Sequence, residues 1–185
     1  MTDAKTLSAL GADIAPDAVR FERLLPGPIE RVWSYLADAD KRALWLGGGA
    51  FEPREGGAGE LRFDNGSLSD EPVPERYAAH CGSIVSRCTV TRWDPPHRLG
   101  FLWEEEGGEP SHVLFELSEA GSGVRLNLTH SRLTPALKLG VSGGWHAHLA
   151  VLEAVLEGRS DRPFWSVLTE VEPVYKARGE TAGAD

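Results

Sequence analysis

The chain has 185 residues, of which 41% are hydrophobic and 25% are charged, a composition typical of one soluble globular domain with tails. Its formal net charge of -9 and its lack of clustered Lys and Arg exclude a general nucleic-acid surface or an anionic-membrane surface. No apolar run approaches the roughly 20 residues that span a bilayer, and the first residues lack the basic and apolar segments of a signal peptide. We therefore expect a cytoplasmic protein with no nucleic-acid partner and no membrane association.

The first third of the chain predicts one strand and two short helices. Residues 18–23 alternate apolar with charged side chains, which is typical of a half-buried strand. Pro28 suits the first position of a helix, and the apolar side chains of residues 29–36 recur with helical spacing. Asp38 is expected to cap a second helix, which the three glycines at 47–49 end.

The middle of the chain predicts six more strands. Residues 50–52 and 59–64 are expected to pair across a glycine-rich turn, and a long loop without periodicity follows at 65–82. Beyond this loop, four segments alternate apolar and polar side chains and are joined by hairpin-like loops: 83–93, 98–104, 112–118 and 124–130.

A late helix at residues 142–157 is the strongest single signal in the sequence. Ser142 suits its N-cap, and Gly158 suits the left-handed residue that follows a helix. Glu153, His146 and Glu157 form its only strongly polar stripe. The opposite arc is broad and apolar and contains Trp145, His148, Leu149, Val151, Leu152, Val155 and Leu156. Most of this helix is therefore expected to be enclosed.

These elements predict an α+β helix-grip fold, because an antiparallel sheet with one apolar face needs a long helix to cover it. About seven strands would wrap around the C-terminal helix, with the two short helices between the first two strands. We expect a flexible lead-in at residues 1–17 and the helix-grip domain at residues 18–160. An extension packed on the domain at residues 161–178, interrupted by Pro173, and a frayed tail at residues 179–185 would follow.

A series of short motifs resembles the START/Bet v 1-like (SRPBCC) superfamily, in the branch named after the C-terminal domain of the activator of Hsp90 ATPase. The resemblance covers roughly residues 18–158 and depends on the order of the motifs. They are residues 28–33, Trp45, Gly56 with Gly57, residues 94–99 with Phe101 and Trp103, residues 126–130, and residues 143–145. It implies the helix-grip fold and a cavity that holds an apolar small molecule in many relatives. It does not imply one chemistry, because lipid carriers, hormone receptors, polyketide cyclases and a co-chaperone domain share the fold.

Two histidines are expected to face the space between sheet and helix. His148 lies in the apolar arc of the helix, and His130 has the strand parity of Leu126 and Leu128. Each could be a core histidine satisfied by a hydroxyl or carbonyl, or could contact a polar group of a ligand. The predicted ligand-binding residues are Trp33, Trp45, Phe63, Cys88, Phe101, Trp103, Phe115, Leu128, His130, Trp145, His148 and Leu152.

Two tryptophans and one loop carry narrower hypotheses. Trp33 and Trp45 would form an entrance gate beside the loop at residues 65–82, or would pack the short helices onto the core. The acidic residues Glu104, Glu105, Glu106 and Glu109 are expected in a solvated loop, with a docking patch for a basic partner as the alternative.

Motifs for metals, cofactors and nucleophiles are not found in the sequence. His146 and His148 would lie about 200° apart around a helix and cannot share an ion. Cys81 and Cys88 lack a Cys-x-x-Cys spacing and are expected to be free thiols, with a disulfide as the alternative. We therefore predict no cofactor, no metal site and no catalytic residue.

Three functions remain open from the sequence. The favoured one is a non-enzymatic protein that binds an apolar or amphipathic small molecule between sheet and helix. The second is a cyclase, dehydratase or hydrolase that uses the same cavity, and the third is a protein-interaction or co-chaperone-like module with a protein partner. Exposed edge strands would also permit a homodimer.

Overall fold

One antiparallel sheet forms the body of the protein. The computed structural model describes residues 8–104 and 107–182. Its seven strands lie in the order β1-β2-β7-β6-β5-β4-β3. Their bounds are β1 Ala12–Ala15, β2 Ala18–Pro26, β3 Ala58–Phe63, β4 Ile84–Asp94, β5 Arg98–Trp103, β6 Ser111–Ala120 and β7 Gly123–Ser131.

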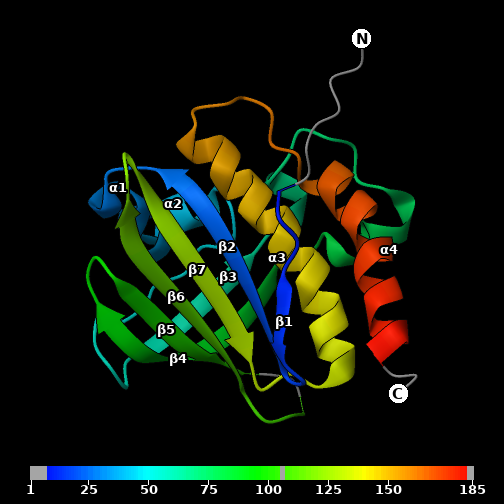
Figure 1. The fold of residues 1–185 in the computed structure, drawn as a ribbon, viewed down its shortest axis with the longest axis horizontal. Helices are drawn as coiled ribbons and strands as arrows, with labels where there is room; N and C mark the ends of the chain where they lie inside the picture. Colours follow the sequence, from blue (N-terminus) through cyan, green and yellow to red (C-terminus); the bar gives the residue numbers. More distant parts are fainter. Residues whose placement is uncertain (1–7, 105–106, 183–185) are drawn as a thin grey trace.

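The sheet curves around one long helix, so the predicted helix-grip fold is confirmed (Figure 1). The helix α3, Pro135–Leu156, lies against the concave face, and α4, Phe164–Ala182, packs on the side of α3 away from the sheet. The short helices α1, Ile29–Ala37, and α2, Ala39–Ala43, connect β2 to β3. Among the described residues, no helix is both long and apolar enough to cross a membrane.

The helix α3 begins seven residues earlier than predicted. Thr134 is its N-cap and accepts a hydrogen bond from the Leu137 amide, while Pro135 occupies the first turn. Ser142 lies inside the helix, where its hydroxyl donates to the Lys138 carbonyl. The sequence pattern did not indicate this start, because the first turns are exposed, lack an apolar stripe and contain Gly140, a poor helix former. The end was predicted correctly, since Gly158 adopts a φ of 69°.

The seventh strand is not the predicted one. Residues 50–52 form only one isolated bridge, which joins Phe51 to Gly59, and Gly49 at a φ of 88° bends the chain just before them. The strand β1 pairs with β2 instead, inside the segment that was predicted to be a flexible lead-in. A four-residue strand with no apolar alternation gives too weak a signal to be seen in the sequence.

The C-terminal extension is one continuous helix. The helix α4 runs through Pro173 to Ala182, so the predicted interruption at Pro173 does not occur. Of the tail predicted at residues 179–185, residues 183–185 lie outside the described residues. The Glu71 carboxylate accepts hydrogen bonds from the amides of Trp165 and Ser166 at the start of this helix. Tyr77 also stacks on Trp165, with ring centroids 5.6 Å apart. The loop at residues 65–82, which contains the 3-10 turns η1 Asn65–Ser67 and η2 Glu75–His80, is thereby held against α4.

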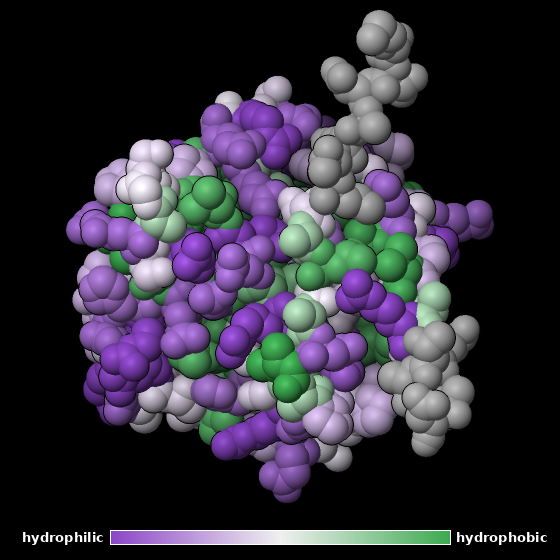
Figure 2. Space-filling model, viewed as in Figure 1, coloured by the Kyte–Doolittle hydropathy of each residue, from purple (hydrophilic) through white to green (hydrophobic). Residues whose placement is uncertain are grey.

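Aromatic side chains fill most of the space between sheet and α3. Trp45, Phe101, Phe115 and Trp145 are buried, and their rings meet edge-on or tilted at centroid distances of 5.9 to 6.4 Å. Outside, hydrophilic side chains predominate on the face that Figure 2 shows, with hydrophobic groups scattered among them. The middle of the grip is therefore a packed core, and hollow space lies toward its end.

A buried arginine fastens the short helices to the rest of the fold. The Arg42 guanidinium donates to the carbonyls of Gly47, Leu36, Ala37 and Gly49. It also lies 4.2 Å from the centre of the Phe51 ring. Burial lowers the pKa of Arg42 to about 10, so the side chain stays charged at neutral pH.

Replacing this arginine should destabilise the fold. Arg42→Met leaves the bonded carbonyls without their donor, and we expect the free energy of unfolding to fall by about 3 kcal/mol. Urea denaturation followed by circular dichroism measures it. The control is Arg62→Met, which removes an exposed side chain paired with Glu60 and should cost less than about 0.5 kcal/mol. Equal losses in both variants would contradict the role given to Arg42.

Candidate functional site

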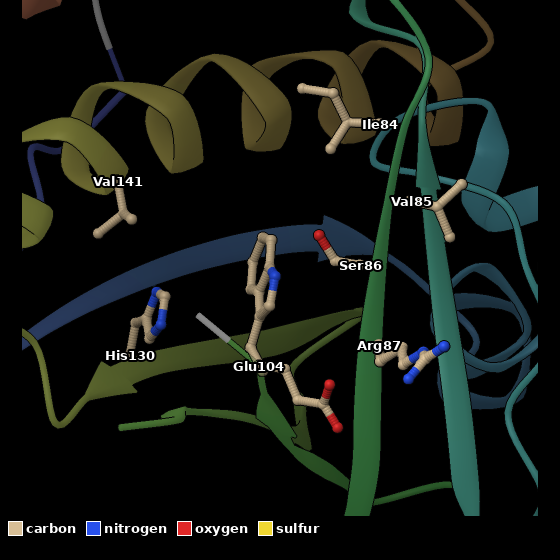
Figure 3. Close-up of a pocket in the computed structure, with 8 residues that line it drawn as sticks. Ile84, Val85, Ser86, Arg87, Glu104, His130 and Val141 are labelled. Atoms are coloured by element: carbon tan, nitrogen blue, oxygen red, sulfur yellow. The ribbon is translucent and has the colours of Figure 1, made fainter. Parts of the chain in front are cut away.

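An open pocket of 580 Å³ lies where β4 and β5 approach the first half of α3. Figure 3 shows Ser86 pointing into it from β4, with Val141 on α3 and His130 on β7 at its far end. Its lining residues are Ile84, Val85, Ser86, Arg87, Trp103, Glu104, His130 and Val141. Ile84 and Ser86 point toward α3 and the hollow, whereas Val85, Arg87 and Glu104 point away from it, because neighbouring residues of a strand alternate between its two faces (Figure 3).

A smaller pocket of 90 Å³ continues the hollow under α3. It shares Trp103 and Val141 with the open pocket, so the two are neighbours. Its lining residues are Leu46, Trp103, Val141, Gly144, Trp145 and His148. We call the two pockets together the β4–α3 site.

His130 links the sheet to α3 within this site. The Trp145 indole N–H donates to His130 Nδ1 over 2.9 Å, so Nδ1 must be unprotonated. Nε2 then carries the proton and donates to the Ser111 hydroxyl, also over 2.9 Å. Burial lowers the pKa of His130 from 6.5 to about 4, with the nearby His112 adding to the shift. Both ring nitrogens are engaged, which matches the prediction of a core histidine satisfied by a hydroxyl.

His148 is held differently and keeps one nitrogen available. Its Nδ1 donates to the Trp45 carbonyl over 2.8 Å. Burial lowers its pKa from 6.5 to about 4, so the imidazole is neutral at pH 7 and Nε2 is an acceptor. Among the described residues, Nε2 has no hydrogen-bond partner. A polar group of a ligand in the smaller pocket could therefore donate to His148.

Trp103 lies at the junction of the two pockets in a stack of parallel rings. Its indole is within 8° of the plane of Phe63 at 5.3 Å, and within 2° of the plane of His130 at 5.8 Å. Trp145 meets it edge-on at 6.2 Å. Because the half-buried Trp103 lines both pockets, it separates the outer space from the inner one.

The structure places the predicted site residues in three groups. Trp103, His130, Trp145 and His148 line the β4–α3 site, and Phe63 supports Trp103. A second group is buried in the core behind the site and contains Trp45, Cys88, Phe101, Phe115, Leu128 and Leu152. Trp33 lies apart on α1, where it meets Trp93 edge-on at 5.5 Å.

The predicted entrance gate of Trp33 and Trp45 is not formed. Trp45 is fully buried, and its indole N–H donates to the Tyr35 carbonyl. It therefore packs the short helices onto the core, the alternative given for it. The helical pattern also placed His146 on the polar stripe of the late helix. In the structure α4 covers His146, and its Nδ1 is 3.0 Å from the Tyr175 hydroxyl.

Sequence reasoning missed the outer wall of the site. Ile84 and Val85 are adjacent apolar residues that are both exposed, by 48% and 56%. Two neighbouring apolar side chains break the period of two, and this irregularity after a long loop was the available signal. Ser86, Arg87 and Val141 carried no signal of their own, because only the fold brings them together.

The cysteines, a metal site and the acidic loop were also considered in the sequence. Cys81 and Cys88 are free thiols, and burial raises the pKa of Cys88 to about 12. Among the described residues, no group of His, Cys, Asp or Glu is arranged to hold a metal ion. Of the predicted acidic loop, Glu105 and Glu106 lie outside the described residues.

Comparison with known proteins connects this chain to one family. The family model for Activator of Hsp90 ATPase homolog 1-like protein matches residues 26–157. The solution structure of the protein encoded by gene BPP1335 from Bordetella parapertussis is 51% identical, with a TM-score of 0.80 over 93% of this chain and 92% of that chain. None of the curated proteins matches this chain.

Two more distant structures share the fold. The crystal structure of CalU16 from Micromonospora echinospora is 23% identical, with a TM-score of 0.67 over 88% of each chain. DynU16, a protein of the dynemicin biosynthetic locus, is 22% identical, with a TM-score of 0.61 over 79% of this chain and 49% of that chain. At these identities the likeness shows the fold alone.

The buried histidines predict how stability depends on pH. His148 has a lower pKa in the folded protein than the ordinary 6.5, so the unfolded chain binds more protons between about 6.5 and about 4. The free energy of unfolding should therefore fall as the pH falls through this window. In His148→Gln, whose amide can still donate to Trp45, the loss between pH 7 and pH 5 should be smaller by roughly 2 kcal/mol.

Urea denaturation at each pH measures this difference. Leu149→Ala, which destabilises the same helix without removing a titrating group, should give a curve parallel to that of the unchanged protein. If the curve for His148→Gln is instead parallel to that of the unchanged protein, His148 has the same pKa in the folded and the unfolded chain. The lowered pKa assigned to His148 would then be wrong.

Proposed function

This chain belongs to the family of Activator of Hsp90 ATPase homolog 1-like proteins, within the START/Bet v 1-like superfamily, and on that premise we propose that it binds an apolar or amphipathic small molecule in the β4–α3 site. One observation carries the proposal: the open pocket exposes the apolar side chain of Ile84 beside the half-buried Trp103 (Figure 3). Exposed apolar groups in a concave wall favour a ligand that covers them.

The energetic gain comes mainly from covering apolar surface. The Ile84 side chain is 48% exposed, so covering it would contribute roughly 1 kcal/mol. Stacking or edge contact with the Trp103 indole adds to this. The core aromatics behind the site are already packed and would need no rearrangement, which lowers the cost of binding.

A polar group at the inner end of the site supports an amphipathic ligand. At the inner end, His148 offers an acceptor nitrogen in an apolar surrounding. A ligand with an apolar body and a hydrogen-bond donor at its inner tip fits this arrangement.

The hydrogen bonds of the histidines favour binding over the cyclase, dehydratase or hydrolase alternative. A general base is usually oriented by a carboxylate and reaches its substrate with the other nitrogen. His130 instead bonds to an indole and a hydroxyl, and His148 bonds to a backbone carbonyl.

Filling the site with a larger side chain should block binding. Val141 lines both pockets, so Val141→Trp should weaken binding of the neutral fluorescent dye Nile red by at least roughly tenfold, by occupying the space that the dye needs. Fluorescence titration measures the Kd. The control is Leu24→Trp, which adds the same side chain at a position on β2 that is 70% exposed and lines neither pocket.

Thermal unfolding of both variants shows whether the fold is kept. If the folded Val141→Trp protein binds Nile red as tightly as the Leu24→Trp protein does, the β4–α3 site is not where the dye binds. If the unchanged protein does not bind the dye at all, the proposed function fails.

A further inference from the structure

A second pocket of 300 Å³ lies on the other side of α3. It is bounded by β1, by the first turns of α3 and by the last turns of α4, three segments that meet at the same end of the fold (Figure 1). Its lining residues are Gly11, Asp13, Pro16, Pro135, Lys138, Leu139, Ser142, Tyr175, Arg178 and Gly179. None of them lines the β4–α3 site, so this is a separate pocket.

Two of the described residues that line this pocket are positively charged and one is negatively charged, although the chain as a whole carries a net charge of -9. Lys138 and Arg178 contribute two positive charges, and Asp13 contributes one negative charge. Lys138 Nζ lies 3.1 Å from Asp13 Oδ1, with 18% of the lysine side chain and 52% of the aspartate side chain exposed. An exposed carboxylate thus satisfies a largely covered ammonium group, and a ligand carboxylate could take the same place.

The rest of the lining is apolar. Pro16, Pro135 and the exposed side chain of Leu139 surround the charged groups. Gly179 lets α4 approach closely, because a β-carbon at this position would lie 2.5 Å from the Leu139 side chain. Leu139 therefore lies close against Gly179 of α4 and offers an apolar wall.

Hydrogen bonds hold the floor of the pocket in place. The Tyr175 hydroxyl accepts from the Gly11 amide over 2.8 Å and lies 3.0 Å from His146 Nδ1. Arg178 Nη1 donates to the Gly11 carbonyl over 2.9 Å. These contacts tie the segment before β1 to α4, so the pocket exists without a ligand and little ordering would be needed on binding.

We propose that this second pocket binds a small amphipathic carboxylate. The ligand carboxylate replaces Asp13 as the partner of Lys138 and lies in the field of Arg178, while its short apolar chain covers Leu139, Pro16 and Pro135. The volume of 300 Å³ is at the lower end of the range for small-molecule sites, so the ligand is smaller than one that would fill the β4–α3 site.

Octanoate is a suitable probe, with octanol as the same chain without the charge. Isothermal titration of the Val141→Trp protein, in which the β4–α3 site is filled, should give a Kd for octanoate on the order of 1 mM or tighter. Octanol should bind at least roughly tenfold more weakly, because it cannot pair with Lys138. Backbone amide shifts in NMR spectra should change at Lys138, Ser142 and Gly179.

Two substitutions should move the affinity in opposite directions. Lys138→Met keeps the length of the side chain but removes its charge, and should weaken octanoate binding roughly tenfold. Asp13→Asn removes the competing carboxylate and should strengthen binding several-fold. Lys41→Met, which removes an exposed lysine on α2, is the control for net charge and should leave the Kd unchanged.

Two results would overturn the proposal. One is an octanoate affinity that is the same in Lys138→Met and Lys41→Met. The other is octanoate binding that is seen in the unchanged protein but lost in Val141→Trp, which would place octanoate in the β4–α3 site. Neither result depends on Nile red, so this proposal and the proposed function can fail separately.

Discussion

The hydrogen bond from the Trp145 indole to His130 joins the helix α3 to the sheet that grips it. A buried indole N–H needs an acceptor, and a buried imidazole can serve as one only when it is neutral. The Ser111 hydroxyl completes the arrangement by accepting the remaining ring proton. Because Trp103 lies parallel to this imidazole, the position of the ring also decides where the two pockets of the β4–α3 site divide.

Much of the fold could be predicted from periodicity. The strand β7 alternates regularly, and the buried part of α3 has a broad apolar arc, so His130 and His148 were assigned inward correctly. Elements with weak patterns were missed: β1 has four residues without alternation, and the first turns of α3 are exposed. The local sequence pattern indicates which face of a helix or strand is buried. It gives little signal for an element whose faces are all exposed.

The location of the site could be predicted only in part. The aromatic residues expected to line a cavity were identified, but several of them fill the core instead, and sequence does not tell which ring leaves a gap. Buried charges were also hidden. Arg23 shares the inward parity of Phe21 on β2, and its Nε lies 2.8 Å from Glu153 Oε1 on α3, a pairing between residues far apart in the chain. Only the packed structure supplies such partners.

The two halves of α3 differ in composition, and this should affect how often each half unfolds locally. Its second half contains no glycine and most of its side chains are buried, whereas its first half contains Gly140 and Gly144, at which an added β-carbon would meet nothing within 4 Å. Glycine at such positions costs about 1 kcal/mol relative to alanine without any steric need. The first turns of α3 should therefore open on their own more often than the rest of the helix does. Val141, which lines the β4–α3 site, lies in this first half of the helix. A bulky molecule would therefore enter the site by displacing the first turns of α3, while the sheet stays in place.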